Sequence, residues 1–397
     1  MTNTVLERLR APFEGPNTTG NSTAFWVVLA LGVVGLLAYP SIASGGAAEN
    51  MSQYLAYAFL ALSLCFIWGY CGILSFGQVA FFGVAGYTFG IVAINIGSYT
   101  GISLAVVVAL FVATAFAAIL GYFMFYGGVR DVYVTIITLV VAVILHRFMG
   151  QTAGSEWAVG DARLGGYNGM VGVPNDAIGF GSVGIDMTGT GLYYIMVGTL
   201  LATYLGLRAL VNSQFGYAMV ATREDEDRTA MFGYNTEFIK LATFTFGGTL
   251  AGLSGVLYMF YSPGGYINPD VFSVSAAALP VIWVSIGGRK SLIGAISAAL
   301  VIQWFNNRID GWLSTGFELP ALTPSLELTT TTVVPGNEWS LVIIGSVLLF
   351  VILVMPEGVA PRIESTVHRV LERLERRREQ RSQSADVEAE TETEVPE

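Results

Sequence analysis

The sequence predicts an all-α protein that crosses a membrane about ten times, and three observations lead to this fold class. Only 12% of the 397 residues are charged and 53% are hydrophobic, whereas soluble domains carry roughly 25% charged residues. The charges are unevenly placed, since residues 50–129 contain none while residues 361–397 contain 17 of the 48. Apolar stretches of about 20 residues, enough to cross ~30 Å of hydrocarbon, recur along the chain.

Ten such stretches are candidates for membrane helices. The first follows Arg8 and Arg10, as the core of a signal peptide would, but no small-residue cleavage site is evident and we expect the helix to be retained. The stretch 267–287 begins near Asp270, and 291–307 is short, so that a re-entrant segment is the alternative there. The ten stretches are 24–43, 51–71, 74–96, 99–125, 128–149, 191–211, 241–261, 267–287, 291–307 and 338–355.

The positions of the cationic residues predict the orientation, because positively charged loops stay in the cytoplasm. With ten spans and a cytoplasmic N terminus, the C terminus is cytoplasmic as well. Sixteen Lys and Arg residues then lie inside and three, Arg147, Arg163 and Arg308, lie outside. Five spans per half, an odd number, would place the two halves in opposite orientation, as in the inverted 5+5 repeats of transporters.

The polar segments complete the predicted organisation. A cytoplasmic N-terminal segment (1–23) precedes a transmembrane domain (24–358) with external loops at 150–190 and 308–337 and a cytoplasmic loop at 212–240. A juxtamembrane amphipathic helix (359–381) follows, because Val367, Val370, Leu371 and Leu374 fall at helical spacing among arginines. The tail 382–397 is acidic and carries no cation, so we expect it to be disordered.

No catalytic, cofactor-binding or metal site is predicted. The two histidines, His146 and His368, have no companion ligands at usable spacing, and Cys65 and Cys71 lie in apolar stretches where we expect buried free thiols. The segment Gly287–Ser291 lacks the first glycine of a phosphate-binding loop, so energy must come from an ion gradient or a partner. Ionisable residues are nearly absent from the spans, which disfavours ion-coupled transport and favours a channel or an externally driven pore.

Two glycine-rich segments are candidates for a solute path. The first starts the span 74–96 and contains Ser75, Gly77 and Gln78, with Phe82 and Tyr87 following. Such a segment can form a broken helix whose backbone lines a cavity. The alternative is close helix packing through small residues.

The second glycine-rich segment, 262–270, enters the eighth span from the outside, whereas the first segment enters the third span from the inside. It therefore occupies the inverted counterpart of the first segment, the arrangement in which transporters place a midplane substrate site. The candidate path residues here are Asn268 in this segment and Ser273 and Trp283 in the span that it leads into.

A charged segment within 212–240 predicts a short cytoplasmic helix. Thr222 to Asp225 have the pattern of a capping box, Arg223 to Phe232 form the helix, and Gly233 ends it. One interpretation is a solvated face; the other is a docking site for a soluble partner, because so short a helix is marginal alone in water. The candidate docking residues are Arg223, Glu224, Asp225, Glu226, Arg228 and Gly233.

Three ordered blocks resemble the permeases of ABC importers for branched-chain amino acids and urea. They are residues 72–90 (GILSFGQVAFFGVAGYTFG), 221–260 (ATREDEDRTAMFGYNTEFIKLATFTFGGTLAGLSGVLYMF) and 281–295 (VIWVSIGGRKSLIGA). The sequence Pro-Glu-Gly at 356–358 resembles the family's Pro-x-Gly ending. The resemblance covers roughly 50–360.

The resemblance implies one of two homologous permease subunits that together form a translocation path in the cell membrane. Two cytoplasmic ATP-binding subunits would drive transport and an external solute-binding protein would deliver the solute, with membrane lipid around the permease and no nucleic acid partner. Residues 222–233 match the family's coupling segment, which seats in a groove on the ATPase.

For the solute, the resemblance favours urea or short-chain amides. Trp283, Arg289, Asn168 and the segment 267–272 look like the urea branch, whereas Gln78 stands where many members have His. Branched-chain amino acids are the second candidate. A facilitator channel that needs no ATP is the alternative from another class.

Overall fold

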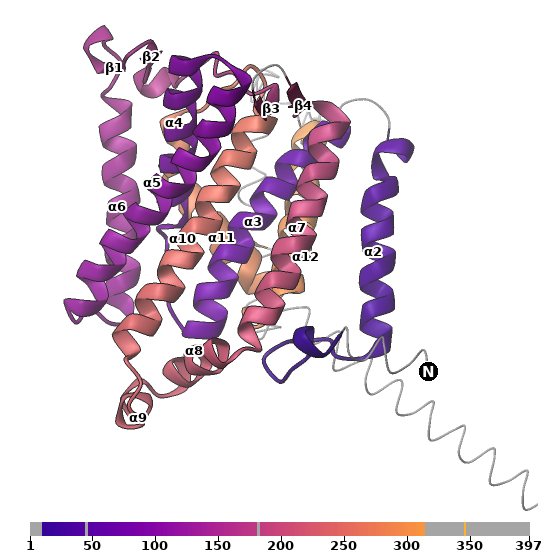
Figure 1. Ribbon diagram of the computed structural model, residues 1–397, viewed down its shortest axis with the longest axis vertical. Coiled ribbons are helices and arrows are strands. Elements are labelled where there is room, and N and C mark those ends of the chain that lie inside the picture. The colour runs from indigo at the N-terminus through magenta and orange to yellow at the C-terminus, as the bar shows by residue number, and fades with distance from the viewer. Residues whose placement is uncertain (1–9, 44–46, 181–182, 314–344, 347–397) are drawn as a thin grey trace, which may run out of the picture.

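The computed structural model describes residues 10–43, 47–180, 183–313 and 345–346, which form a bundle of long helices (Figure 1). Within these residues, seven helices are long and apolar enough to cross a membrane, or up to eight if one bent pair counts as a single span. This confirms a mostly helical, multi-pass architecture. The seven are α2 (Thr23–Ile42), α3 (Ala47–Cys71), α4 (Gln78–Ile96), α5 (Tyr99–Tyr126), α6 (Val132–Gly150), α7 (Gly189–Val211) and α10 (Thr236–Tyr261).

Short elements lie at the two ends of the bundle (Figure 1). One end, called here the α9 end, carries α8 (Gln214–Glu224) and α9 (Glu226–Met231), and the 3-10 turn η1 (Ala11–Phe13) precedes α2. The opposite end, the hairpin end, carries two antiparallel two-stranded sheets. Its elements are η2 (Ser155–Trp157), β1 (Ala158–Val159), β2 (Ala162–Arg163), η3 (Gly166–Asn168), β3 (Ala177–Phe180) and β4 (Val183–Asp186).

The region after α10 differs from the two full spans expected at 267–287 and 291–307. A 3-10 turn, η4 (Pro269–Phe272), leads into α11 (Val274–Gly287), and α12 (Leu292–Leu313) follows with a bend of 120°. The 14 residues of α11 reach only about 21 Å, less than the ~30 Å of a hydrocarbon core. Gly288, at φ +98°, opens the turn, and α12 runs through Leu313, beyond the start expected for an external loop at 308.

The core forms around α3, and 89% of its most apolar 18 residues are buried. Small residues bring α5 and α10 together, because Cβ atoms added at Gly248 and Gly252 would overlap Ala117 and Ala113 of α5. Both cysteines are buried and free, as predicted. In contrast, no residue of α2 is buried, so α2 stands at the rim of the bundle.

Several predictions concern residues outside the described ranges. They are the span 338–355, the loop 308–337 beyond Leu313, the juxtamembrane helix 359–381 and the tail 382–397, together with the beginning of the segment 1–23. The inverted repeat, the ten-span count and the side on which the termini lie stay predictions.

Candidate solute path and coupling surface

The segment between α3 and α4 turns back into the bundle before α4 begins. The Ser63 hydroxyl donates to Gln78 Oε1 at 3.0 Å, and Ser63 lies eight residues before the end of α3 at Cys71, about 12 Å along a helix. The first residue of α4 therefore lies inside the bundle. The span expected to start at residue 74 starts at Gln78, because residues 72–77 are not helical.

Threonines of α6 satisfy the backbone of this buried segment. The Phe76 N–H donates to Thr138 Oγ1 at 3.2 Å, and the Thr135 hydroxyl donates to the Leu74 carbonyl at 3.0 Å. The Gly77 N–H donates to Ser75 Oγ at 3.0 Å. Irregular backbone at membrane depth requires such partners. The sequence indicated the irregular segment but not the two threonines, which lie about 60 residues away.

An aromatic cluster lies next to the start of α4. The Tyr57 ring of α3 lies 5.7 Å from Trp283 of α11, 5.9 Å from Tyr258 of α10 and 6.4 Å from Phe82 of α4, measured between centroids. The fold thus brings together Phe82 and Trp283, two of the predicted path residues. Tyr57 and Tyr258 were not predicted, since they lie in apolar runs that carry no polar signal.

The segment 262–273 packs against the part of α4 that lies toward the hairpin end. The Tyr87 ring stacks on Phe272 at 5.9 Å with an interplanar angle of 14°, and a Cβ at Gly83 would overlap the same ring. Asn268 donates to Asp270 Oδ2 at 3.1 Å, and Ser273 caps α11 by accepting from the Ala276 N–H at 3.2 Å. Asn268 and Ser273 therefore shape this segment locally.

At the α9 end, the predicted single helix 223–232 is two helices. The expected capping box at Thr222 is wrong, because Thr222 lies within α8 and its hydroxyl donates to the Ala218 carbonyl at 2.8 Å. The cap is Asp225, which separates α8 from α9 and whose side chain accepts from the Arg228 N–H at 2.9 Å. Gly233 ends the segment as predicted, at φ +89°, a conformation that costs other residues energy.

Two of the predicted docking residues face the bundle rather than solvent. The Lys240 ammonium of α10 bonds Glu226 Oε1 at 2.5 Å, and their side chains are 9% and 24% exposed. Arg223 donates to the backbone carbonyl of Gly69 at the end of α3 and pairs with Glu224. Glu226 and Arg223 therefore attach the α8–α9 segment to α10 and α3.

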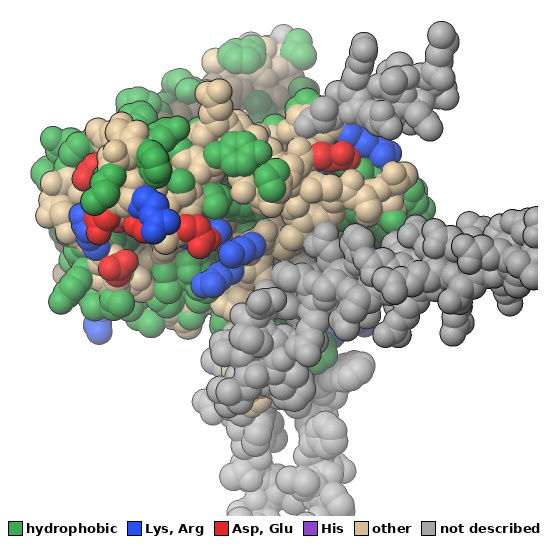
Figure 2. All heavy atoms as spheres, turned by 90° about the horizontal axis from the view of Figure 1, so that it is seen from below, with side chains coloured by type: hydrophobic (Ala, Val, Ile, Leu, Met, Phe, Trp, Pro, Cys, Tyr) green, Lys and Arg blue, Asp and Glu red, His purple; other side chains and the backbone are tan. Residues whose placement is uncertain are grey.

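The outward surface of α9 is apolar at its tip and charged on its sides. Met231 is 87% exposed and Phe232 77%; we call these two residues the α9 tip. Asp227 pairs with Arg130 at 3.6 Å, and Arg228 with Asp225 at 3.4 Å. Seen from this end, acidic, basic and hydrophobic side chains lie side by side (Figure 2). Sequence reasoning chose the charges and missed the tip, whose signal was two apolar residues just before Gly233.

The carboxyl of Glu224 lies in a positive environment on this surface. The hydrogen bond and charge of Arg223, with further attraction from Lys290 and Arg289, lower the pKa of Glu224. Glu224 is therefore ionised at neutral pH, and its favourable contribution is present above its unfolded pKa and lost as the pH falls through the folded one.

Comparison with known sequences places these features in a family. Residues 46–352, which are 307 of the 397, match the family described as branched-chain amino acid transport system, permease component. The chain belongs to this family. Its family and its apolar helices make it a multi-pass protein of the cell membrane, and the resemblance of its three sequence blocks is confirmed at the level of the family.

Individual relatives of the permease carry the same description. The high-affinity branched-chain amino acid transport system permease protein LivM of Escherichia coli (strain K12) is 24% identical over 350 residues, 82% of this chain and 72% of LivM. The permease protein LivH of the corresponding system of Salmonella typhimurium is 28% identical over 170 residues, 41% of this chain and 46% of LivH. No solved structure matches the chain.

The Lys240–Glu226 pair yields a stability prediction for the permease. Lys240→Met is expected to lower the free energy of unfolding by about 2 kcal/mol, because it leaves the mostly buried Glu226 carboxylate without its cationic partner. The measurement is thermal unfolding of the purified protein in detergent. Lys290→Met, at an exposed position, is the matched control, and Lys240→Met with Glu226→Leu should regain most of the loss. Equal unfolding temperatures of Lys240→Met and Lys290→Met would contradict the prediction.

A second anchored element of the permease is its N-terminal segment. Residues 13–21, called here the strap, cross the α9 end and are held by Arg208 of α7, which is only 1% exposed. Arg208 donates to the carbonyls of Phe13 at 2.5 Å, Thr19 at 3.2 Å and Gly20 at 2.7 Å. Its guanidinium also lies 4.7 Å from the Phe25 ring centroid.

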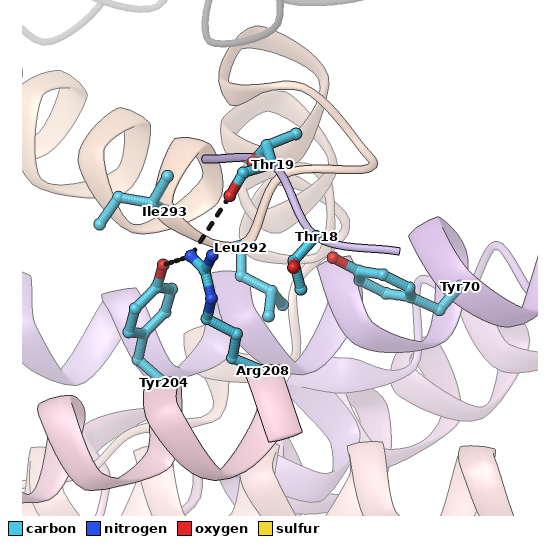
Figure 3. Close-up of a pocket in the computed structure, with 7 residues that line it drawn as sticks. All are labelled: Thr18, Thr19, Tyr70, Tyr204, Arg208, Leu292 and Ile293. Carbon is cyan, nitrogen blue, oxygen red and sulfur yellow. Dashed lines mark hydrogen bonds between the residues drawn. The ribbon is translucent and has the colours of Figure 1, made fainter. Parts of the chain in front are cut away.

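The strap connects the end of α7 with the turn between α11 and α12. Asn17 donates to the Val211 carbonyl at 2.8 Å, and the hydroxyls of Thr19 and Ser291 lie 3.1 Å apart. Beside Arg208 remains a cavity of about 10 Å³, about enough for one water. Figure 3 shows Arg208 and Tyr204 reaching it from α7, with Thr18 and Thr19 of the strap opposite.

Proposed function

We propose that this chain is a permease subunit of an ABC importer that carries branched-chain, hydrophobic amino acids into the cell. The observation that carries the proposal is the family match over residues 46–352, together with relatives named as branched-chain amino acid permeases. In this proposal two ATP-binding subunits drive transport, a second homologous permease completes the path, and an external solute-binding protein delivers the solute.

The aromatic interior supports an amino acid with an apolar side chain over urea. The rings of Tyr57, Phe82, Tyr258 and Trp283 surround the start of α4, an environment suited to an aliphatic group. Of the residues that favoured urea, Asn168 of η3 lies beside the segment 267–272 at the hairpin end, whereas Arg289, whose carbonyl accepts from Cys65 Sγ at 3.4 Å, lies toward the α9 end. They do not combine into one small polar site.

The solute path in this proposal follows α4. Its residues are those predicted from sequence, Ser75, Gly77, Gln78, Phe82, Tyr87, Asn268, Ser273 and Trp283. Ser75 and Gly77 shape the buried segment before α4, and Phe272 covers the helix near Tyr87. The remaining step is coupling to ATP hydrolysis. In this proposal α9 docks on an ATP-binding subunit that lies in the cytoplasm. Closure of the ATPase pair then moves α9 and, through the Glu226–Lys240 pair, also moves α10.

Transport by the assembled complex in vesicles tests the proposal. The permease is co-expressed with its partner subunits, reconstituted with the solute-binding protein, and supplied with radiolabelled leucine or urea. ATP-dependent leucine uptake that competes with isoleucine and valine supports it. ATP-dependent urea uptake without leucine uptake would show that the solute is urea and not a branched-chain amino acid. Uptake by this chain alone, without ATP, would show that it is a facilitator and not part of an importer.

A further inference from the structure

Three buried polar side chains along the proposed path have a polar atom without a hydrogen-bond partner. They are Gln78 Nε2, Tyr87 Oη and Trp283 Nε1, and the three residues are 1%, 4% and 0% exposed. Buried polar atoms almost always have partners, so each exception needs an explanation. Three exceptions along the same path indicate groups whose hydrogen-bond partner is a transiently bound ligand.

The free atoms share one chemical character, because all three can donate a hydrogen bond. The Gln78 carbonyl shares the single Ser63 hydroxyl proton with the Leu60 carbonyl, at 3.0 and 2.7 Å, and the Gln78 amide N–H groups have no partner. The Trp283 indole is a donor only, and the Tyr87 hydroxyl can donate. For Gln78 and Trp283 the missing partner is therefore an acceptor, such as a carboxylate or a carbonyl oxygen, and the Tyr87 hydroxyl can bind the same kind of group.

The spacing of these donors defines two positions rather than one. Gln78 and Tyr87 are nine residues apart on α4, about 13 Å along the helix axis, too far for one small solute. Trp283 belongs with Gln78, because Tyr57 contacts both the Trp283 ring and Phe82, and Phe82 is one helical turn from Gln78. Tyr87 forms the other position with Phe272, toward the hairpin end.

We propose that α4 carries two recognition stations for the acceptor group of the transported molecule: an outer one at Tyr87 and an inner one at Gln78 and Trp283. The inner station binds an α-carboxylate with its two donors, while an aliphatic side chain and an ammonium group lie against the rings of Tyr57, Phe82 and Tyr258. Aromatic faces attract cations. This inference rests on the proposed function and specifies its solute as a zwitterionic aliphatic amino acid.

Urea fits the inner station poorly by the same chemistry. A urea molecule offers one acceptor and four N–H donors, so most of its hydrogen bonds need acceptors in the site. The unpartnered atoms of the inner station, Gln78 Nε2 and Trp283 Nε1, are donors only. A carboxylate, in contrast, accepts from both.

Variants that each remove one donor test the stations in the complete importer. Trp283→Phe and Tyr87→Phe keep an aromatic ring and remove one donor each, and Gln78→Leu removes the amide. We expect ATP-dependent leucine uptake to fall at least about tenfold in Trp283→Phe and Gln78→Leu, since a hydrogen bond to a charged group is lost. The fall in Tyr87→Phe is expected to be smaller, because the outer station has one donor.

Thr249→Val is the matched control. It removes a hydroxyl that bonds Thr114 at 2.8 Å between α5 and α10, outside the stations, and should leave uptake within about twofold of the parent. Basal ATP hydrolysis and elution on size exclusion report whether each variant assembles. If Gln78→Leu fails to assemble, Trp283→Phe decides, because it keeps a ring in the same place.

The outcomes separate this inference from the proposed function. Leucine uptake by the parent complex that is unchanged in both Trp283→Phe and Gln78→Leu overturns the inner station and leaves the importer intact. Absence of leucine uptake in the parent overturns the proposed function. Loss of uptake in Thr249→Val equal to that in Trp283→Phe also overturns the inference, because the effect would then reflect packing.

Discussion

Phe232→Asp is expected to abolish ATP-driven uptake while the permease remains folded in the membrane. Phe232 is 77% exposed at the α9 tip, so its replacement disturbs little of the packing among the described residues. A carboxylate there would have to be buried, unpaired, against the partner, and exposed aromatic anchors of this kind dominate the energy of interfaces. We expect a loss of at least about 3 kcal/mol in docking, or more than 100-fold in affinity.

Co-purification of the ATP-binding subunits and leucine uptake in vesicles measure this effect. Gly233→Trp, at a φ of +89°, and Arg228→Glu, whose side chain is 75% exposed, should act in the same direction. Arg130→Gln is the matched control, because its exposed pair with Asp227 is worth only about 0–1 kcal/mol. Normal uptake and normal co-purification in Phe232→Asp would show that the ATPase docks elsewhere.

Arg208→Met is expected to release the strap and strongly destabilise the permease. Arg208 is nearly fully buried and bonds three strap carbonyls. Without it these carbonyls lose a charged donor, and hydrogen bonds to charged groups contribute about 1.5–3 kcal/mol each. We expect a decrease of at least about 3 kcal/mol in the free energy of unfolding, or local detachment of the strap at a similar cost.

Thermal unfolding in detergent and limited proteolysis of the N-terminal segment distinguish these two outcomes. Arg208→Lys should be intermediate, because an ammonium keeps the charge but not the planar fork that reaches several carbonyls. Asn17→Ala loses a single bond to Val211 and is the control for one strap contact. If Arg208→Met shows neither a lower unfolding temperature nor faster cleavage, then Arg208 does not hold the strap.

The sequence by itself determined the features that depend on local composition. The apolar stretches predicted α2, α5 and α7 to within three residues, because the length of a membrane helix is set by the thickness of the bilayer and hydropathy reports it directly. Gly233 was assigned correctly as a helix end, because only the left-handed conformation of one residue is needed there. The charged segment before it was recognised from its composition, but its division into α8 and α9 at Asp225 was not predicted.

The tertiary structure alone decided which residues contact one another at the candidate sites. Sequence placed Glu226 on a docking surface, but the fold buries it against Lys240, 14 residues away. Thr135 and Thr138 support a loop about 60 residues distant, and Arg208 binds carbonyls 188 to 195 residues before it. Phe82 and Trp283 belong to one aromatic cluster only because α4 and α11 each bring a ring against Tyr57.

The physical reason for this division is the range of the interactions. Partition into lipid and helix capping act over one helix or one turn, and a short window of sequence contains all the groups involved. Hydrogen bonds and ring contacts between helices depend on packing, which joins residues that no local pattern connects. Whether a buried polar atom finds a partner, as Gln78 Nε2 and Trp283 Nε1 do not within the described structure, is therefore decided by the fold.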